Sequence, residues 1–370
     1  MGPLWQEMFH VGRGAVGNIL FFVLAAVGLC MFFVGRWQER TGIRTMVFIG
    51  AVIMGLDVLL LTVVSNIAEV YLWAFLMGAA SCFIYIPALT TVQRWYPMRR
   101  GLATGTVNLV FAVSAAVMAP IFGVLLESLG YAATAAALGA LALATGIIAA
   151  QFTEPPREPM PQLGPPSGDQ MKAVPGVSRD LTVSQSLRTA SFWCLWFAWA
   201  LQGAAGIAMV TLSVLYGMAK GLPRETAVAI LTVFNLANGL SRPVMGHLSD
   251  RVGRNQAMSL CFLAGGLAYF ALPFGEGLPI LAALAGVIGF SFGTLFAVSA
   301  PLAVDCFGIS HFGAVFGVVF TAYGFVAWPL GPSLSGYVLD ATGGNFPAVF
   351  AYLGTFCVAS SILIHFVRPR

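Results

Sequence analysis

Arg242 is the residue whose type and position most directly indicate chemistry. It lies inside an apolar stretch, residues 226–245, four residues before Gly246. If that stretch spans a membrane, an arginine there is costly unless it pairs or faces water, so it marks a functional site by default. Its guanidinium binds a carboxylate through two parallel hydrogen bonds, and Asn238 lies one helical turn away. We expect Arg242 to contact an anion; the alternative is an arginine that snorkels to the interface or fastens the next loop.

Asp57 is a second charged residue inside an apolar stretch, residues 45–65. Two interpretations remain open: a buried acid that titrates and couples proton movement, or a protonated acid that bonds a neighbouring helix. Other chemistry has no support, because the six cysteines lack metal-ligand or redox spacing and no phosphate loop or nucleophile–base pair is present. We therefore expect no enzyme, no cofactor and no metal site.

The elements that must position these residues are membrane-spanning helices. Of the residues, 59% are hydrophobic and only 9% are charged, against about a quarter charged in soluble domains. Apolar runs of about 20 residues recur, and only helices can use such runs to cross a bilayer. We predict an all-α membrane protein with eleven spans, at residues 15–34, 45–65, 69–93, 102–126, 131–152, 191–216, 226–245, 256–274, 279–304, 312–338 and 347–367.

The distribution of Lys and Arg predicts the orientation of these spans. One set of alternate loops, with the C-terminal tail, holds 14 of the 18 cations, whereas the other side holds Arg13, Lys220 and Arg224. Positively charged loops stay in the cytoplasm. The net charge of +4 therefore reflects topology, and we expect no nucleic-acid partner. We expect a multi-pass protein of a bacterial inner membrane with a cytoplasmic C-terminus.

The chain contains an internal repeat. The segment from Gly35 reads G-x-x-x-E-R-x-G, and the segment from Gly246, 211 positions later, reads G-x-x-x-D-R-x-G. Two further landmarks recur at an offset of 212 positions, namely Gly101-x-x-x-Gly105 with Gly313-x-x-x-Gly317, and Pro120 with Pro332. Such repeats are typical of secondary transporters. Subtracting the offset of 211 from the span at residues 191–216 predicts a further helix before residue 15. The eleven predicted spans do not include that helix.

Three regions follow from the repeat. Residues 1–152 form an N-terminal bundle of five spans, and residues 191–370 form a C-terminal bundle of six. Residues 153–190 are polar and contain seven prolines, so they form a cytoplasmic linker without a core of its own. The first helix of a twelve-helix plan is therefore expected to be missing, either because the start lies upstream or because this is a truncated form.

The repeated loop motif and three other stretches resemble the major facilitator superfamily, and within it the oxalate/formate antiporter and monocarboxylate porter group. The stretches are RWYPMRRGLATG from Arg94, LRTASFWCLW from Leu187 and NLANGLSRPVMG from Asn235. The resemblance implies a two-bundle fold with no enzymatic activity and transport of a small organic anion. It also implies that Arg242 and Asn238 contact the anion, and that the repeated loops form a conformational latch made of Gly35, Glu39, Arg40, Gly246, Asp250 and Arg251.

The same resemblance implies that aromatic residues line the cavity, at Tyr85, Phe296, Phe320 and Tyr323. Packing between helices is an equally good interpretation of each one. Oxalate-transporting members pair their arginine with a lysine in the helix equivalent to residues 312–338, but here Tyr323 takes that place and the helix has no Lys or Arg. A single fixed cation can neutralise one carboxylate but not two. This favours a monocarboxylate over a dicarboxylate as the substrate.

The sequence therefore predicts a monomeric secondary active transporter in the lipid bilayer, with a small organic anion as substrate and a coupling proton or an exchanged anion. Two alternatives stay open. The first is an efflux transporter for amphipathic or drug-like compounds, which an aromatic, charge-poor cavity would suit. The second is a non-transporting sensor or an inactive truncated form.

Overall fold

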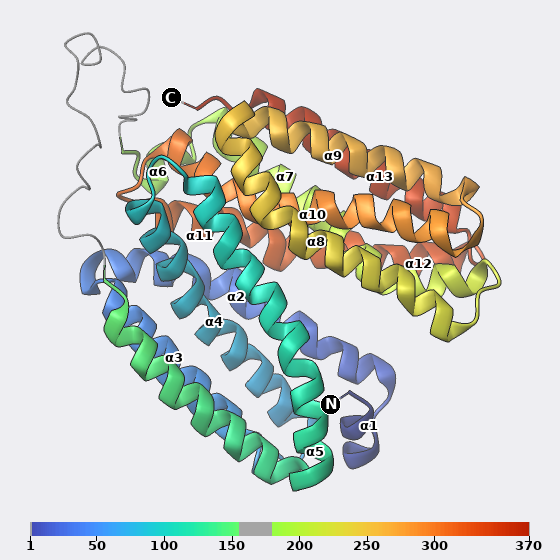
Figure 1. Cartoon of the computed structure of the whole chain (residues 1–370), viewed down its shortest axis with the longest axis horizontal. Coiled ribbons are helices and arrows are strands. Elements are labelled where there is room, and N and C mark those ends of the chain that lie inside the picture. Colours follow the sequence, from blue (N-terminus) through green and yellow to red (C-terminus); the bar gives the residue numbers. More distant parts are fainter. Residues whose placement is uncertain (1, 155–179, 370) are drawn as a thin grey trace.

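The computed structural model describes residues 2–154 and 180–369, and within them it contains helices and no strand (Figure 1). The helices before the linker are α1 (Gly2–Phe9), α2 (Arg13–Thr41), α3 (Ile43–Leu60), α4 (Ile67–Trp95) and α5 (Arg100–Phe152). Those after it are α6 (Val183–Ser186), α7 (Ala190–Ala219), α8 (Arg224–Val252), α9 (Arg254–Ala271), α10 (Gly277–Phe307), α11 (Phe312–Thr321), α12 (Leu334–Ala341) and α13 (Phe346–Phe366). Most of the predicted linker lies outside the described residues.

The membrane spans agree with the prediction. Within the described residues, ten helices are long and apolar enough to cross a bilayer, with α11 and α12 joined into one span. Helix α5 is two arms, residues 100–129 and 131–152, because Gly130 has φ 76° and ψ 175°. That left-handed conformation suits glycine. Counting the arms separately gives the eleven predicted spans. Helix α1 has eight residues, or about 12 Å, which is less than half of the hydrocarbon core.

The spans gather into two bundles, α2 to α5 and α7 to α13 (Figure 1). Within the first, α3 packs against α4 and the second arm of α5, which runs beside α3 in the view. Within the second, α8 packs against α10 and α9 against α13. The bundles meet mainly through two helix pairs, α2 with α11 and α5 with α8, and α5 also contacts α10. The all-helical two-bundle fold predicted from the sequence is thus confirmed.

Glycines set the closest approach of the two bundles. A Cβ on Gly35 would overlap the backbone of Gly313, and a Cβ on Gly246 would overlap the backbone of Gly101. These contacts are copies of each other, because Gly35 and Gly246 are equivalent in the repeat and so are Gly101 and Gly313. Small residues let helix backbones approach closely where the hydrophobic effect gives no driving force between helices. The duplicated sequence therefore folds into a duplicated interface.

The repeated loops lie at one end of the molecule, which we name the arginine-rich face: the end that carries Arg36, Arg40, Arg44, Arg94, Arg99, Arg100, Arg188, Arg251 and Arg254. The bundles lie close together there, near α6 and α11, and separate toward α1 and α12 (Figure 1). All hydrogen bonds and ion pairs between the bundles within the described residues lie either at this face or around Arg242. The interface is therefore closed at one end.

Replacing Gly35 or Gly246 with Ala is expected to loosen the arginine-rich face. The added methyl group has no space against the facing backbone, and overpacking of this kind costs about 1–3 kcal/mol. Amide hydrogen exchange at the starts of α11 and α5 should accelerate by about tenfold, since about 1.4 kcal/mol corresponds to a factor of ten. Gly123→Ala is the control, because a Cβ at Gly123 meets nothing within 4 Å. Equal exchange in all three variants would contradict this role of the glycines.

Candidate functional site

Arg242 lies on α8 at the interface of the two bundles. Its Nη2 and Nε donate to the Oδ1 of Asn238 at 2.9 and 3.2 Å, and its Nη1 donates to the backbone carbonyl of Asn108 on α5 at 2.7 Å. The guanidinium carbon lies 5.1 Å from the centre of the Phe296 ring. Within the described residues, no acidic side chain pairs with Arg242. The guanidinium is therefore stabilised by two neutral hydrogen-bond acceptors and by the face of the Phe296 ring. None of the described groups that contact it carries a negative charge.

Asn108 is a site residue that the sequence analysis missed. It is buried, with 1% of its surface exposed, and its Nδ2 donates to the carbonyls of Thr104 and Phe296. Its Oδ1 accepts from the Tyr85 hydroxyl at 3.0 Å. One side chain therefore joins α4, α5 and α10 beside Arg242. The available signal was an amide in the middle of an otherwise apolar span.

The four predicted aromatic residues lie together around a fifth, Trp199 of α7. The ring centre of Trp199 lies 5.1 Å from that of Phe296, 4.5 Å from that of Phe320 and 5.7 Å from that of Tyr323. Tyr85 reaches the group from the other bundle, with its ring centre 5.8 Å from that of Phe320. These five rings, which we name the aromatic wall, adjoin Arg242 through Phe296.

Two polar groups of the aromatic wall have no hydrogen-bond partner among the described residues. The indole N–H of Trp199 is buried and has no acceptor among the described residues, and the Tyr323 hydroxyl has no hydrogen bond there either. Tyr323 lies in a π-helical stretch, Ala322–Ala327, a deviation that often marks functional positions. Gly203 of α7 makes room for its ring, since a Cβ there would lie 2.9 Å from it. A guanidinium with unused donors nearby is suited to an anion.

Asp57 lies apart from Arg242. It is 3% exposed, and neither carboxylate oxygen has a hydrogen-bond partner among the described residues. Helix α3, which carries it, packs mainly against α4 and α5 within the first bundle. One interpretation of Asp57 required a hydrogen bond from its protonated carboxyl group to a neighbouring helix. No such hydrogen bond is present among the described residues.

One half of the predicted latch is an ionic network at the arginine-rich face. The Asp250 carboxylate accepts from the backbone N–H groups of Gly101 and Leu102, both at 3.0 Å, so it caps the start of α5 in the other bundle. Negative charge is stabilised at a helix N-terminus. Arg254 joins Asp250, at 3.6 Å, to Asp305, which also pairs with Arg100 at 3.4 Å. The sequence analysis did not include Arg100, Arg254 and Asp305 among the latch residues.

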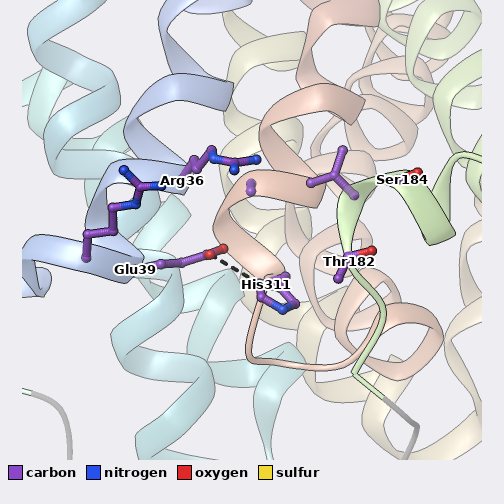
Figure 2. A pocket seen from close by; sticks show the side chains of 8 residues that line it. Arg36, Glu39, Thr182, Ser184 and His311 are labelled. Carbon is purple, nitrogen blue, oxygen red and sulfur yellow. Dashed lines mark hydrogen bonds and ion pairs between the residues drawn. The ribbon is translucent and has the colours of Figure 1, made fainter.

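The other half of the predicted latch is simpler. Glu39 pairs with Nδ1 of His311 at 3.1 Å, next to the contact of Gly35 with Gly313 (Figure 2). Arg40 and Arg251 have no hydrogen bond or ion pair among the described residues. The structure thus places four of the six latch residues in contact with the opposite bundle: Gly35, Glu39, Gly246 and Asp250.

Two repeated helical bundles thus meet at the arginine-rich face, and Arg242 between them has no acidic partner among the described residues. The sequence model of the Major Facilitator Superfamily matches residues 1–231 and 221–370. The chain belongs to the major facilitator superfamily.

Relatives and solved structures agree with this assignment. The chain is 25% identical over 338 residues to the oxalate:formate antiporter of Oxalobacter formigenes, covering 91% of this chain and 78% of the relative. It is 24% identical to monocarboxylate transporter 6 of Homo sapiens, with 94% and 70% covered. The fold matches FucP in its outward conformation with a TM-score of 0.76 at 15% identity, covering 100% of this chain and 93% of FucP. It also matches the human organic anion transporter MFSD10 with a TM-score of 0.72 at 14% identity, covering 98% and 88%.

Replacing Asn108 with Leu is expected to destabilise the site. The change leaves the Tyr85 hydroxyl without its acceptor and removes the bond to the Phe296 carbonyl, and each buried unsatisfied group costs about 1–3 kcal/mol. The Tm in detergent should therefore fall. Asn235→Leu is the matched control, because Asn235 is exposed on α8 and makes no hydrogen bond with the described residues. If the two variants had the same Tm, Asn108 would not organise the site.

Proposed function

We propose that this protein is a secondary active transporter of a small organic anion, with Arg242 as the group that binds the carboxylate. The observation that carries the proposal is the guanidinium between the bundles, which has no acidic partner among the described residues. A cation in a membrane must find an anion or water. Arginine presents a planar pair of donors that matches a carboxylate, and the aromatic wall beside it would receive an apolar substituent.

A monocarboxylate fits this site better than a dicarboxylate. The segment 312–341, which carries Phe320 and Tyr323, has no Lys or Arg, so the region around Arg242 offers one fixed charge. A second carboxylate would enter the site without a counter-ion, and burying an unpaired charge is costly. The similarity to monocarboxylate transporter 6 supports a monocarboxylate, whereas the similarity to an oxalate:formate antiporter supports a small organic anion in general.

Alternating access would move the site between the two sides of the membrane. The arrangement described here, closed at the arginine-rich face and separating toward the other end (Figure 1), corresponds to an outward-facing state if that face is cytoplasmic. Its opening would break the Asp250 and Glu39 contacts together, since both join the same two bundles. The distribution of the cations makes the arginine-rich face cytoplasmic in this proposal, and we propose a monomer in a bacterial inner membrane.

Arg242→Lys should abolish most uptake of a monocarboxylate. Lysine keeps the charge but loses the planar pair of donors, so proteoliposomes with ¹⁴C-labelled formate, acetate or lactate should show at least a tenfold loss, equivalent to about 1.4 kcal/mol. Arg224→Lys is the control, because Arg224 is exposed at the start of the same helix. Wild-type rates for Arg242→Lys, or uptake only of amphipathic cations, would contradict the proposal and favour efflux of other compounds. Absence of uptake in the wild type would favour a sensor.

Asp57 is our candidate for proton coupling. Its ionised form would be an unpaired buried charge, which is costly, so loss of its proton requires the first bundle to rearrange. Asp57→Asn keeps the shape but cannot release a proton. We expect exchange of labelled for unlabelled substrate to persist in this variant while accumulation driven by a pH gradient is lost. Retention of both activities would assign Asp57 a structural role.

A further inference from the structure

A pocket on the arginine-rich face lies where three segments of the chain meet, at the end of α2, the start of α11 and helix α6 (Figure 2). Its volume is about 350 Å³, within the range of small-molecule sites. The polar and charged groups that line it come from both bundles and the end of the linker: Arg36, Glu39, Arg40, Thr182, Ser184 and His311. It lies near the repeated glycine contact of Gly35 with Gly313.

The charge in this pocket is incompletely balanced. Arg36 and Arg40 are one helical turn apart and exposed, and neither makes a hydrogen bond or ion pair with the described residues, whereas Arg44, Arg100 and Arg254 are paired. The one lining carboxylate, Glu39, is taken by His311 (Figure 2). Two arginines against one glutamate leave a net positive charge among the residues that line the pocket.

A second acid of this face, Asp180, makes no ion pair with these two arginines among the described residues. Partial burial raises the pKa of Asp180, but hydrogen bonds from Ser310 outweigh it and hold that pKa below its usual value. Asp180 is thus directed toward the start of α11 and is not a lining residue. Thr182 and Ser184 lie on the wall opposite Arg36 (Figure 2), where the Thr182 hydroxyl caps the start of α6 by accepting from the Gln185 N–H.

We propose that this pocket binds a small phosphate-bearing anion and that the bound anion holds the two bundles together at the arginine-rich face. The two guanidinium groups supply charge-assisted donors that a phosphate group accepts, and Thr182 and Ser184 form the opposite wall of the pocket. The arginines belong to the first bundle, whereas α6 is fixed to the second by the Leu181 N–H, which donates to the Phe307 carbonyl at 2.8 Å. The ligand therefore bridges the bundles, and binding favours the closed arrangement in which both walls are present.

A consequence concerns regulation of the transport cycle. An anion bound in the pocket would delay opening of this face, so phosphate-bearing compounds on that side would slow substrate release there. This consequence rests on the proposed function, whereas the binding itself does not.

Hydrogen exchange on the full chain tests the binding directly. In phosphatidylcholine nanodiscs, inorganic phosphate at constant ionic strength against chloride should slow exchange at the end of α2 and the start of α11. Arg36→Gln and Arg40→Gln should each raise the phosphate concentration required by about tenfold, the effect of one charge-assisted hydrogen bond. Arg251→Gln is the matched control, since Arg251 is the counterpart of Arg40 in the repeat and does not line the pocket.

A second arm identifies the source of the phosphate group. Nanodiscs of phosphatidylglycerol without added phosphate should give the same protection, again dependent on Arg36 and Arg40, if a lipid headgroup is the ligand. Protection by either source that requires the two arginines supports the site. Protection by neither source, or an equal loss in Arg251→Gln, overturns it without bearing on uptake through Arg242.

Discussion

The structure depends on one electrostatic constraint: a guanidinium lies between two apolar helical bundles, and no carboxylate of the described residues neutralises it. Arg242 is stabilised by the Asn238 amide oxygen, the Asn108 carbonyl and the face of Phe296. Each is a partial charge, and together they hold the cation without cancelling it. The site therefore keeps a preference for an anion. An acidic side chain in the same place would have satisfied the arginine and removed that preference.

The second requirement is an interface that can form and break, and glycine provides it. Gly35 against Gly313, and Gly246 against Gly101, bring backbones together over small areas, so the closed face depends on a few polar contacts such as that of Asp250 with the start of α5. The two copies differ in chemistry. One is a network of two acids and two arginines, and the other is a single glutamate–histidine pair. Opening at the two copies would therefore respond differently to ionic strength.

The spans, the repeat and Arg242 could be predicted because each has a local signal: apolar runs, a motif at a fixed offset and a cation within a span. Asn108 and Trp199 could not, because their importance lies in contacts that join α4, α5, α7 and α10. The break at Gly130 falls between two predicted spans, residues 102–126 and 131–152. The π-helical turn around Tyr323 had no signal in the sequence. The ionic network was anticipated only at Asp250, since Arg100 and Asp305 are paired by tertiary structure alone.

The central claim is that Arg242 binds a carboxylate, and NMR of ¹⁵N-labelled arginine side chains tests it most directly. Titration with acetate should shift the Nε resonance of one slowly exchanging guanidinium, which is absent from the Arg242→Lys spectrum. Acetamide, which has the same shape without the charge, should leave that resonance unchanged. A resonance that acetate does not move, or that acetamide moves equally, would contradict the account.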